Sequence, residues 1–348
     1  RERVAILYGG RSGEHEVSLN SGGSVYRNLD TERYEPLLIG ITSSGKWYLQ
    51  PREVAEAGEA TDTPLSIPES SERVVSLLPG EGFAVNGAPL DVDVVFPVLH
   101  GSFGEDGTVQ GALEIAKQRV KELWAYHGLP VLPFVGFGRR ELERGSPEEL
   151  VAPLLEEWSF PLFVKPARAG SSVGISRVAT PSALAGAVSE ALLWDSRVIV
   201  EPGIEAREIE TAALGGAEPL IFDPGEVEVR SEFYSYEAKY LDPAGATLRV
   251  PAELAGETRD RIREVVARAF TTADCHGFAR IDLFVELGSD RVFLNEINTI
   301  PGFTRISMFP KMAEAGGVPY PELLSRLIEL AKERKTERDN LRYEFHNR

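Results

Sequence analysis

The stretch "ARIDLFVELGSDRVFLNEIN", residues 279–298, contains two runs in which apolar and polar residues alternate, joined by a short polar turn. This pattern predicts the two antiparallel strands of a hairpin, with residues 288–290 as the loop. Asp282 then lies directly opposite Glu296. Like charges that face each other across a strand pair are destabilising, so this register predicts a cation between the two acids.

The two faces of the predicted hairpin differ in character. One face is apolar apart from Asn295, and its other members are Ile281, Leu283, Val285, Phe293 and Ile297. The opposite face is expected to carry Arg280, Asp282, Phe284, Leu294, Glu296 and Asn298. In the same register Arg280 lies opposite Asn298. We therefore expect the first face to lie in a core and the second to bind a ligand.

The polar face offers the ligand atoms that Mg²⁺ prefers. Asp282, Glu296 and Asn298 supply oxygen atoms, and Mg²⁺ keeps waters and substrate phosphates in its remaining positions. Phe284 and Leu294, on the same predicted face, could hold an adenine between them. The alternative is an exposed polar face on which the neighbouring arginine neutralises both acids.

Composition limits the class of protein. The 348 residues suffice for two or three domains, and the formal charge of -17 disfavours nucleic acid and anionic membrane surfaces as partners. The single cysteine, Cys275, cannot form an internal disulfide, and the start "RERVAILY" contains no apolar signal segment. No apolar run is long enough to span a bilayer. These features predict a cytoplasmic enzyme or binding protein.

The order of patterns along the chain predicts three domains. Residues 1–116 alternate between strand and helix patterns, which favours an α/β domain with a mostly parallel sheet. Within it, residues 45–82 are rich in Pro, Glu, Ser and Thr and are expected to form a surface excursion. Residues 117–204 are expected to form a smaller α+β unit. Residues 205–348 form the last domain, with a polar and aromatic loop over 226–245.

Two loops could contact a nucleotide. "VKPARAGSSVGISRV" places Lys165 at a strand end before a turn in which the backbone N–H groups of Ser171 and Ser172 could approach phosphate oxygens. No helix follows and no Walker pattern occurs, so this is not a P-loop, and an ordinary hairpin turn is the alternative. In "EPGIEARE", Glu201 and Glu208 flank a Pro-Gly bend whose backbone could contact an adenine, with Glu208 at a ribose.

A glycine-rich turn near the start points to a different ligand. "VAILYGGRSGEHEVSLNSG", residues 4–22, predicts strand, turn and helix, a layout that usually binds phosphate. Glu14 and Glu16 would repel a phosphate there, and a carboxylate in the first turn of a helix can instead hold a cation. Further along, "SEFYSYEAKY" is long enough to act as a lid and ends in Lys239 and Tyr240. A loop that packs its own aromatic rings is the alternative.

Several long motifs occur in one order over nearly the whole chain: "GGRSGEHEVSLNSG", "HGSFGEDGTVQG", "VKPARAGSSVGIS", "EPGIEARE", "FYSYEAKY", "FARIDLFVE" and "NEINTIPGFTRISMFP". Together they resemble the D-alanine:D-alanine ligases of the ATP-grasp superfamily. The resemblance implies three α/β and α+β domains, with ATP gripped between the central and C-terminal ones. It also implies that ATP phosphorylates the carboxylate of one D-alanine and that the amine of a second attacks the acylphosphate, for peptidoglycan precursor synthesis.

The resemblance assigns roles to the residues that match the family motifs. Glu16 would hold the ammonium group of the first D-alanine and would be linked to Ser171 and Tyr240. Two Mg²⁺ ions, or Mn²⁺ in their place, would bridge the ATP phosphates and bind to Asp282, Glu296 and Asn298. The phosphates would contact Lys117, Lys165 and Lys239, and the adenosine would contact Glu201, Ile204 and Glu208.

The same resemblance places the second half of the reaction near the end of the hairpin. Arg280 and the backbone N–H of Gly302 would stabilise the oxyanion of the tetrahedral intermediate. Ser307, with Arg280, would hold the carboxylate of the second D-alanine. His100 would lie near the first substrate, although a histidine after a strand is more often structural. The resemblance also implies a homodimer.

The chain departs from the family at one point, and two other functions are open. After "GALEIA" the family has a G-x-P-Y-x-G-x-G stretch and an M-D-K-like signal, whereas here Ala116 runs into "KQRVKELW". Either the segment is deleted or the printed sequence omits it, and the role of Lys117 depends on which is true. A ligase forming D-alanine:D-lactate or D-alanine:D-serine is one alternative, although Tyr240 favours the peptide bond. A nucleotide-binding protein without turnover is the other, disfavoured by the costly charges of the hairpin.

Overall fold

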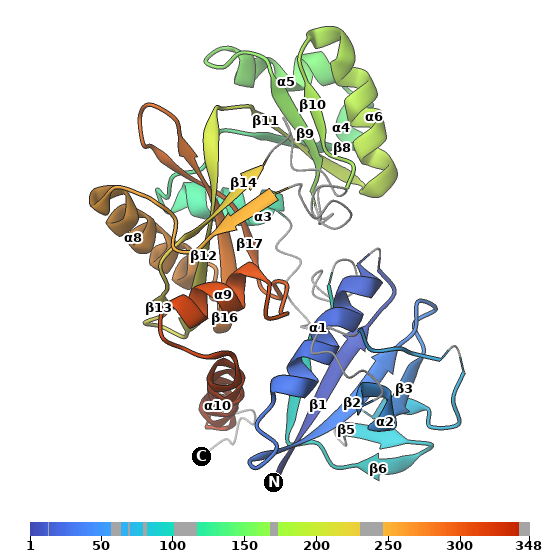
Figure 1. Ribbon diagram of the computed structural model, residues 1–348. Helices are drawn as coiled ribbons and strands as arrows, with labels where there is room; N and C mark the ends of the chain where they lie inside the picture. The colour runs from blue at the N-terminus through green and yellow to red at the C-terminus, as the bar shows by residue number, and fades with distance from the viewer. Residues whose placement is uncertain are drawn as a thin grey trace, which may run out of the picture.

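The computed structural model describes residues 1–12, 14–56, 64–68, 70–78, 82–100, 117–167, 173–229 and 246–340. The chain forms three bodies, each built on its own sheet (Figure 1). The mixed α/β character expected from the sequence is confirmed.

The N-terminal body contains a four-stranded sheet in the order β3-β2-β1-β7. Its strands are β1 (Glu2–Gly9), β2 (Tyr34–Ile41), β3 (Trp47–Gln50) and β7 (Val94–Pro97). β1 pairs in parallel with β2 and with β7, while β3 is antiparallel to β2, so the sheet is mostly parallel as predicted. The body is completed by α1 (His15–Asn28), α2 (Glu53–Glu56) and a small sheet of β4 (Val75–Leu78), β5 (Gly82–Val85) and β6 (Ala88–Leu90).

The predicted strand, glycine turn and helix occur at β1 and α1. Gly9 has a φ of 88°, and a Cβ atom there would lie 2.3 Å from the Ile41 carbonyl oxygen, so only glycine allows this close approach. Ser18 of α1 then ties the helix to the sheet: its Oγ accepts the Gly9 N–H at 2.8 Å and donates to the Val98 carbonyl at 2.5 Å. The start of α1 is therefore fixed at the carboxyl end of β1.

Residues 45–82, which were expected to form a surface excursion, include both exposed and buried side chains where the structure describes them. Tyr48 and Leu49 of β3 are 4% and 5% exposed, and Leu65 is 1% exposed in the core shared with α1. The segment is polar on average, but a few well-spaced apolar residues are enough to anchor it. Average composition does not register such isolated anchors, and the surface excursion as a whole stays a prediction.

The central body is an antiparallel sheet in the order β10-β9-β11-β8, covered by helices. Its strands are β8 (Val135–Gly138), β9 (Leu162–Pro166), β10 (Ser176–Val178) and β11 (Arg197–Pro202). Its helices are α4 (Arg139–Leu142), α5 (Pro147–Leu155), the 3₁₀ helix η1 (Pro181–Ala183) and α6 (Leu184–Trp194). The α5 helix starts at a capping box, in which Ser146 Oγ accepts the Glu149 N–H and Glu149 accepts the Ser146 N–H.

The C-terminal body holds the hairpin in a six-stranded sheet of order β15-β14-β12-β16-β17, with β13 paired to β12. Its strands are β12 (Ala206–Gly215), β13 (Leu220–Ile221), β14 (Gly225–Val229), β15 (Ala246–Arg249), β16 (Gly277–Glu286) and β17 (Val292–Asn298). Its helices are α8 (Gly256–Thr272), α9 (Met308–Ala315) and α10 (Tyr320–Asp339). The core between the sheet and α8 contains Ile281, Leu283 and Val285, which confirms the apolar face predicted for β16.

Helix α3 (Lys117–Tyr126) packs against the C-terminal body (Figure 1). Trp124 of α3 is fully buried there, and its ring N–H donates to the Ala269 carbonyl of α8 at 3.1 Å. Val120 lies in the same core. The domain boundaries expected from the sequence stay a prediction. Helix α3 starts the expected central domain, residues 117–204, but it packs on the C-terminal sheet.

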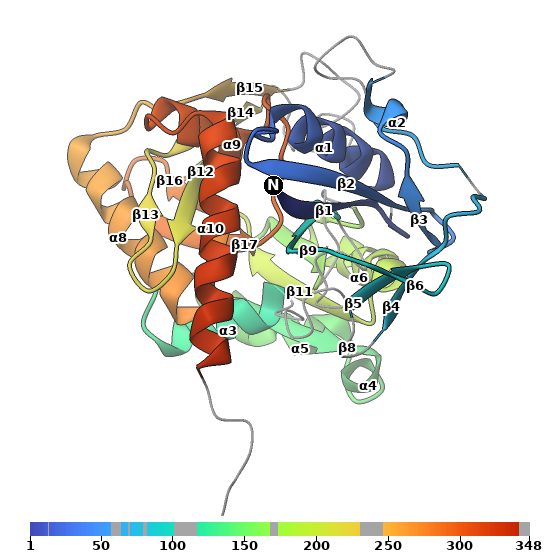
Figure 2. The same cartoon turned by 90° about the horizontal axis from the view of Figure 1, so that it is seen from below.

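The N-terminal and C-terminal bodies share an apolar cluster. Helix α10 contacts α1, β7 and β16, and in Figure 2 it runs between the N-terminal body and the C-terminal sheet. The Phe303 ring lies 5.9 Å from that of Phe96 and 5.3 Å from that of Phe278, centroid to centroid. Because Phe96 belongs to the N-terminal sheet and Phe303 follows β17, this contact fixes the end of the hairpin against the N-terminal body.

Replacing Trp124 by alanine is expected to lower the free energy of unfolding by about 3 to 5 kcal/mol, because it removes a buried ring and its hydrogen bond. Tyr126→Ala is the matched control on the same helix, since that side chain is 87% exposed, and should change it by less than about 0.5 kcal/mol. Urea unfolding measures both values. Equal effects of the two substitutions would contradict the packing of α3.

Candidate active site

A row of three acids crosses the C-terminal sheet. Asp282 of β16 pairs with Glu296 of β17, as predicted, and on its other side with Glu210 of β12. Residues that pair directly lie on one face of a sheet, so the three carboxylates stand side by side. The acid row is defined here as Glu210, Asp282 and Glu296. The sequence analysis missed Glu210, although the alternation of Glu208 and Glu210 along β12 was a usable signal.

Arg280 pairs with the acid row. Its Nε and Nη2 donate to the two oxygens of Asp282 at 2.7 and 2.8 Å, and its Nε lies 3.1 Å from Glu210 Oε2. Asn298, opposite Arg280 as predicted, donates from Nδ2 to Asp282 at 3.0 Å. The Asp282 side chain is 14% exposed. These contacts confirm that the two facing acids and their neighbours gather on one partly buried face.

Burial and neighbouring charges shift the pKa values of the groups in and beside the acid row. Burial raises the pKa of Asp282 to about 7 against the opposing effect of Arg280, and Glu210 and Glu296 add to the rise. The Arg280 guanidinium correspondingly has its pKa raised well above its ordinary value, because the carboxylates outweigh the effect of its burial. Carboxylate and amide oxygens are the ligands that Mg²⁺ prefers, so the donor set fits Mg²⁺. Within the described ranges, no group of three or more His, Cys, Asp or Glu side chains is already gathered as a metal site.

The predicted register was wrong beyond Asp282. An irregularity between Asp282 and Leu283 shifts the pairing by one residue, so Leu283 pairs with Leu294 and Phe284 with Phe293. Asn295 is the extra residue of this bulge, and an extra residue turns every following side chain to the other face. Leu294 is therefore fully buried in the core with Leu283 and does not lie beside Phe284. Its predicted contact with an adenine is withdrawn.

A second polar cluster lies where the central and C-terminal bodies meet. Glu201 of β11 accepts hydrogen bonds from two lysines, from Lys121 at 2.6 Å on Oε2 and from Lys165 on Oε1. Burial alone would raise the pKa of Glu201, but the two lysines lower it to about 2. Burial lowers the pKa of Lys121, and Glu201 opposes that shift. We call Lys121, Glu201 and Lys165 the lysine cluster.

The lysine cluster adjoins the acid row through Phe284. Lys165 Nζ lies 5.9 Å from the centre of the Phe284 ring, and Phe284 pairs with Glu208 of β12, two residues from the acid row on each strand. Ile204 lies in the short connection between β11 and β12. The predicted nucleotide residues Lys165, Glu201, Glu208 and Phe284 are thus brought to one region. Lys121 was missed, although its position three residues before the buried Trp124 placed it on the inner side of α3.

The segment after β17 is held by the N-terminal body. His100 is 3% exposed, with Nε2 2.9 Å from Ser21 Oγ of α1 and Nδ1 3.1 Å from the Ile300 carbonyl oxygen. The Phe303 N–H donates to the same Ser21 Oγ at 3.4 Å. Both ring nitrogens of His100 are therefore engaged within the protein. Its structural role is observed, and its predicted substrate contact stays a prediction.

Two predicted residues meet in this segment. A Cβ atom built on Gly302 would lie 3.1 Å from Ser307 Oγ, so the backbone of Gly302 and the Ser307 hydroxyl are close neighbours. Ser307 precedes the first residue of α9, and its Oγ accepts the Thr304 N–H at 3.1 Å. Glu16 lies in the first turn of α1, where it is exposed, as predicted for a carboxylate at this helix start.

Several predicted site residues cannot be placed. Ser171, Ser172, Lys239 and Tyr240 lie outside the described residues, and so does most of the predicted loop over 226–245. Lys117 is the first residue of α3, and its side chain is not among those described.

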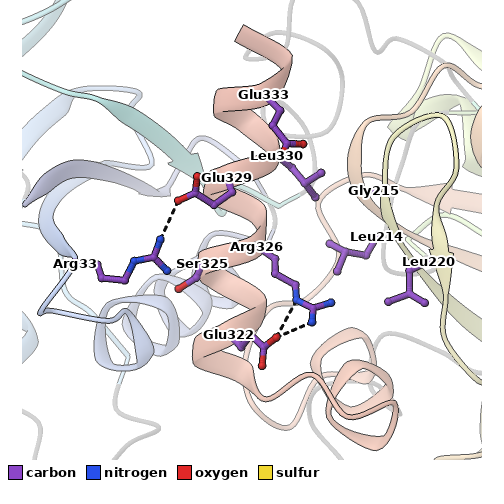
Figure 3. A pocket seen from close by; sticks show the side chains of 10 residues that line it. All are labelled: Arg33, Leu214, Gly215, Leu220, Glu322, Ser325, Arg326, Glu329, Leu330 and Glu333. Atoms are coloured by element: carbon purple, nitrogen blue, oxygen red, sulfur yellow. Dashed lines mark hydrogen bonds and ion pairs between the residues drawn. The ribbon is translucent and has the colours of Figure 1, made fainter. Parts of the chain in front are cut away.

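One cavity lies apart from these clusters. It has a volume of about 390 Å³ and opens between α10, Arg33 and the edge formed by Leu214 and Leu220 (Figure 3). Charged side chains on its wall pair with one another, as Arg33 does with Glu329 at 3.0 Å. None of the predicted site residues lines it. Among the described helices, none has the length and apolar character needed to cross a membrane.

The three-body fold with an acid row and a lysine cluster on facing bodies is that of the ATP-grasp enzymes. The N-terminal domain model of the D-ala D-ala ligases matches residues 3–120, and the C-terminal domain model matches residues 123–329. The chain therefore belongs to the D-alanine–D-alanine ligase family.

Individual relatives match over nearly the full length of both chains. The chain is 41% identical to a D-alanine–D-alanine ligase of Treponema denticola, over 96% of this chain and 97% of the relative. It is 43% identical to D-alanine–D-alanine ligase A of Bradyrhizobium diazoefficiens, over 97% of each. These alignments span 361 and 364 residues, more than the 348 of this chain, so the relatives carry residues without a counterpart here.

Solved structures give the same picture. The D-alanine–D-alanine ligase of Coxiella burnetii superposes with a TM-score of 0.81 at 32% identity, covering 97% of this chain and 96% of that one. The VanG D-Ala:D-Ser ligase of Enterococcus faecalis superposes with a TM-score of 0.80 at 33% identity, covering 95% and 99%. The fold is therefore common to ligases with different second substrates.

Replacing Glu201 by glutamine is expected to lower the free energy of unfolding by about 3 to 5 kcal/mol at pH 7, because two buried ammonium groups lose their anion. The folded-state pKa of Glu201 is lowered from 4.5 to about 2, so this stabilisation is present above pH 4.5 and is lost as the pH falls toward 2. Urea unfolding at a series of pH values measures the difference between the variant and the unmodified chain. The exposed Glu205→Gln is the control, and a difference that stays constant down to pH 2 would contradict the assignment.

Proposed function

We propose that this chain is an ATP-dependent ligase that joins two molecules of D-alanine into D-alanyl-D-alanine for peptidoglycan precursor synthesis. The observation that carries the proposal is the pairing of Asp282 with Glu296 beside Arg280, on two strands of which β17 leads into the segment with Gly302 and Ser307. Membership of the D-alanine–D-alanine ligase family supports the same reaction.

The nucleotide is proposed to lie between the lysine cluster and the acid row. Lys165 is proposed to contact a phosphate of the nucleotide. Phe284, whose ring centre lies 5.9 Å from Lys165 Nζ, offers an apolar surface for the adenine. Glu201, Ile204 and Glu208 are proposed to face the adenosine. Lys117, Ser172 and Lys239 are further proposed phosphate contacts, made by residues whose side chains are not described.

Asp282, Glu296 and Asn298 would hold two Mg²⁺ ions. Mn²⁺ is proposed to be able to take the place of Mg²⁺. The ion supplies neutralisation of phosphate charge when it is bound. Lys165 of the lysine cluster is proposed to orient the triphosphate toward the acid row. Positioning and charge neutralisation are the main requirements for phosphoryl transfer, and no protein nucleophile is needed.

The two substrates are proposed to meet beside Arg280. A carboxylate oxygen of the first D-alanine takes the terminal phosphoryl group of ATP and ADP leaves. The unprotonated amine of the second then attacks the carbonyl carbon of the acylphosphate. The C–O bond to phosphate breaks, phosphate leaves with the electron pair of that bond, and the nitrogen loses one proton to solvent or to the departing phosphate. Arg280 and the Gly302 N–H stabilise the oxyanion formed in between, while Ser307 with Arg280 holds the second carboxylate.

The first D-alanine is proposed to be held by its ammonium group at Glu16, the exposed carboxylate in the first turn of α1. Ser171 and Tyr240 are proposed to act with Glu16. The protein is further proposed to be a cytoplasmic homodimer. Each chain is proposed to contain three domains, which are residues 1–116, 117–204 and 205–348.

The alternative second substrates are D-serine and D-lactate. The D-serine alternative is favoured by one observation, the similarity to the VanG D-Ala:D-Ser ligase at a TM-score of 0.80. Phosphate release from ATP in the presence of Mg²⁺ is expected to depend on D-alanine. If phosphate release does not depend on D-alanine, the chain is not a ligase and is a nucleotide-binding protein instead. Mass spectrometry of the products with D-alanine mixed with D-serine or D-lactate is expected to detect D-alanyl-D-alanine as the main product.

Replacing Glu296 by glutamine is expected to lower turnover by about a hundredfold or more while the chain stays folded, because one proposed metal ligand loses its charge. Glu286→Gln is the matched control in the same hairpin. Glu286 pairs with Arg291 at 2.7 Å near the turn, away from the acid row, and its loss should change turnover less than about twofold. Phosphate release is measured with each variant. Turnover of Glu296→Gln close to that of the control would exclude the acid row as the metal site.

A further inference from the structure

The lysine cluster contains one more cation than its carboxylate needs. Glu201 offers two oxygens, and each accepts from a different ammonium group, Lys121 on Oε2 and Lys165 on Oε1. The side chains of Lys121, Glu201 and Lys165 are 2%, 3% and 12% exposed. When both lysines are protonated, the three residues carry one positive charge more than Glu201 offsets, and Glu296 of the acid row is the further carboxylate that acts on Lys121. Such a charge is costly unless an anion can approach it.

The two lysines occupy different positions. Lys121 is enclosed between α3 and the central body, 6.0 Å from the centre of the Phe134 ring. Lys165 is the more exposed of the two and lies 5.9 Å from the ring centres of both Phe163 and Phe284. Because Phe284 is on the same sheet face as the acid row, Lys165 is the lysine directed toward the proposed nucleotide site.

We propose that Lys121 is a positioning residue that keeps Glu201 paired, so that Lys165 can exchange its bond to Glu201 for a bond to a phosphate of the nucleotide. This inference rests on the proposed function. It adds a role for a residue that makes no contact with the nucleotide itself.

The role proposed for Lys121 follows from charge pairing in the lysine cluster. Without Lys121, Glu201 and Lys165 form a neutral buried pair, and Lys165 could reach a phosphate only by leaving a buried carboxylate uncompensated. With Lys121 in place, the carboxylate keeps one cation when Lys165 moves. The second lysine therefore lowers the cost of releasing the first.

The experiment compares two probes, Mg²⁺–ADP and adenosine, by isothermal titration calorimetry on the full chain. They differ by the phosphates, so the ratio of their dissociation constants reports the availability of Lys165. Lys121→Met is expected to reduce the preference for ADP by about tenfold, because a charge-assisted contact to phosphate is weakened. Lys121→Met leaves a neutral pair in the cluster, so the variant is expected to fold. Lys121→Arg keeps the charge and should keep the preference.

Two further variants separate this role from others. Arg119→Met removes a cation from the same helix, but Arg119 is 67% exposed and pairs with Glu122, so the preference should not change. The double variant Lys121→Met with Glu201→Gln removes the acid that would retain Lys165. It should recover the preference for ADP lost in Lys121→Met, even if adenosine and ADP both bind more weakly.

The outcomes are distinct. A preference unchanged in Lys121→Met, or a loss not recovered in the double variant, would overturn the inference. A purely structural role would weaken adenosine and ADP equally and leave their ratio constant. Lys165→Met tests the proposed function separately: if it leaves the preference intact, or if the unmodified chain binds neither probe, the nucleotide site itself is overturned.

Discussion

The structure depends on the cost of holding like charges together on a buried sheet face. Three neighbouring strands bring Glu210, Asp282 and Glu296 into one row, and Arg280 is bonded to two of them. Burial raises the pKa of Asp282, Arg280 opposes that rise, and Glu210 and Glu296 add to it. The apolar residues on the other face of the same strands prevent the row from relaxing, because separating the acids would expose that core. A row of carboxylates held in this way offers oxygen ligands to a cation.

The lysine cluster presents the opposite imbalance close by. Lys121 and Lys165 share Glu201, so an acidic and a basic excess face the same region from two bodies. The Phe284 ring lies between them, near Lys165 and on the face of the acid row. An anion accompanied by a divalent cation could interact with both clusters at once. This complementarity suits a nucleotide better than a ligand of a single charge.

The N-terminal body contributes rigidity to the opposite end of the site. The network of Ser21, His100, Ile300 and Phe303 joins α1 to the segment that carries Gly302 and Ser307. The aromatic contact between Phe96 and Phe303 supports the same joint. A segment with few regular hydrogen bonds of its own is thereby held to the start of the helix that carries Glu16. The buried His100 side chain links Ser21 to Ile300. The residues next to His100 in the sequence did not predict these two partners.

The sequence by itself determined the local features: the alternation that makes β16 and β17, the register that sets Asp282 against Glu296, and the glycine turn before α1. These follow from backbone geometry, which repeats every two residues in a strand and admits only glycine at Gly9. Only the tertiary structure decided that the bulge at Asn295 buries Leu294 and that Glu210 and Lys121 join the charged clusters. It also decided that residues 45–82 supply core anchors. A bulge and a charge partner depend on which segments become neighbours, and the energies that select those neighbours come from packing distant parts of the chain together.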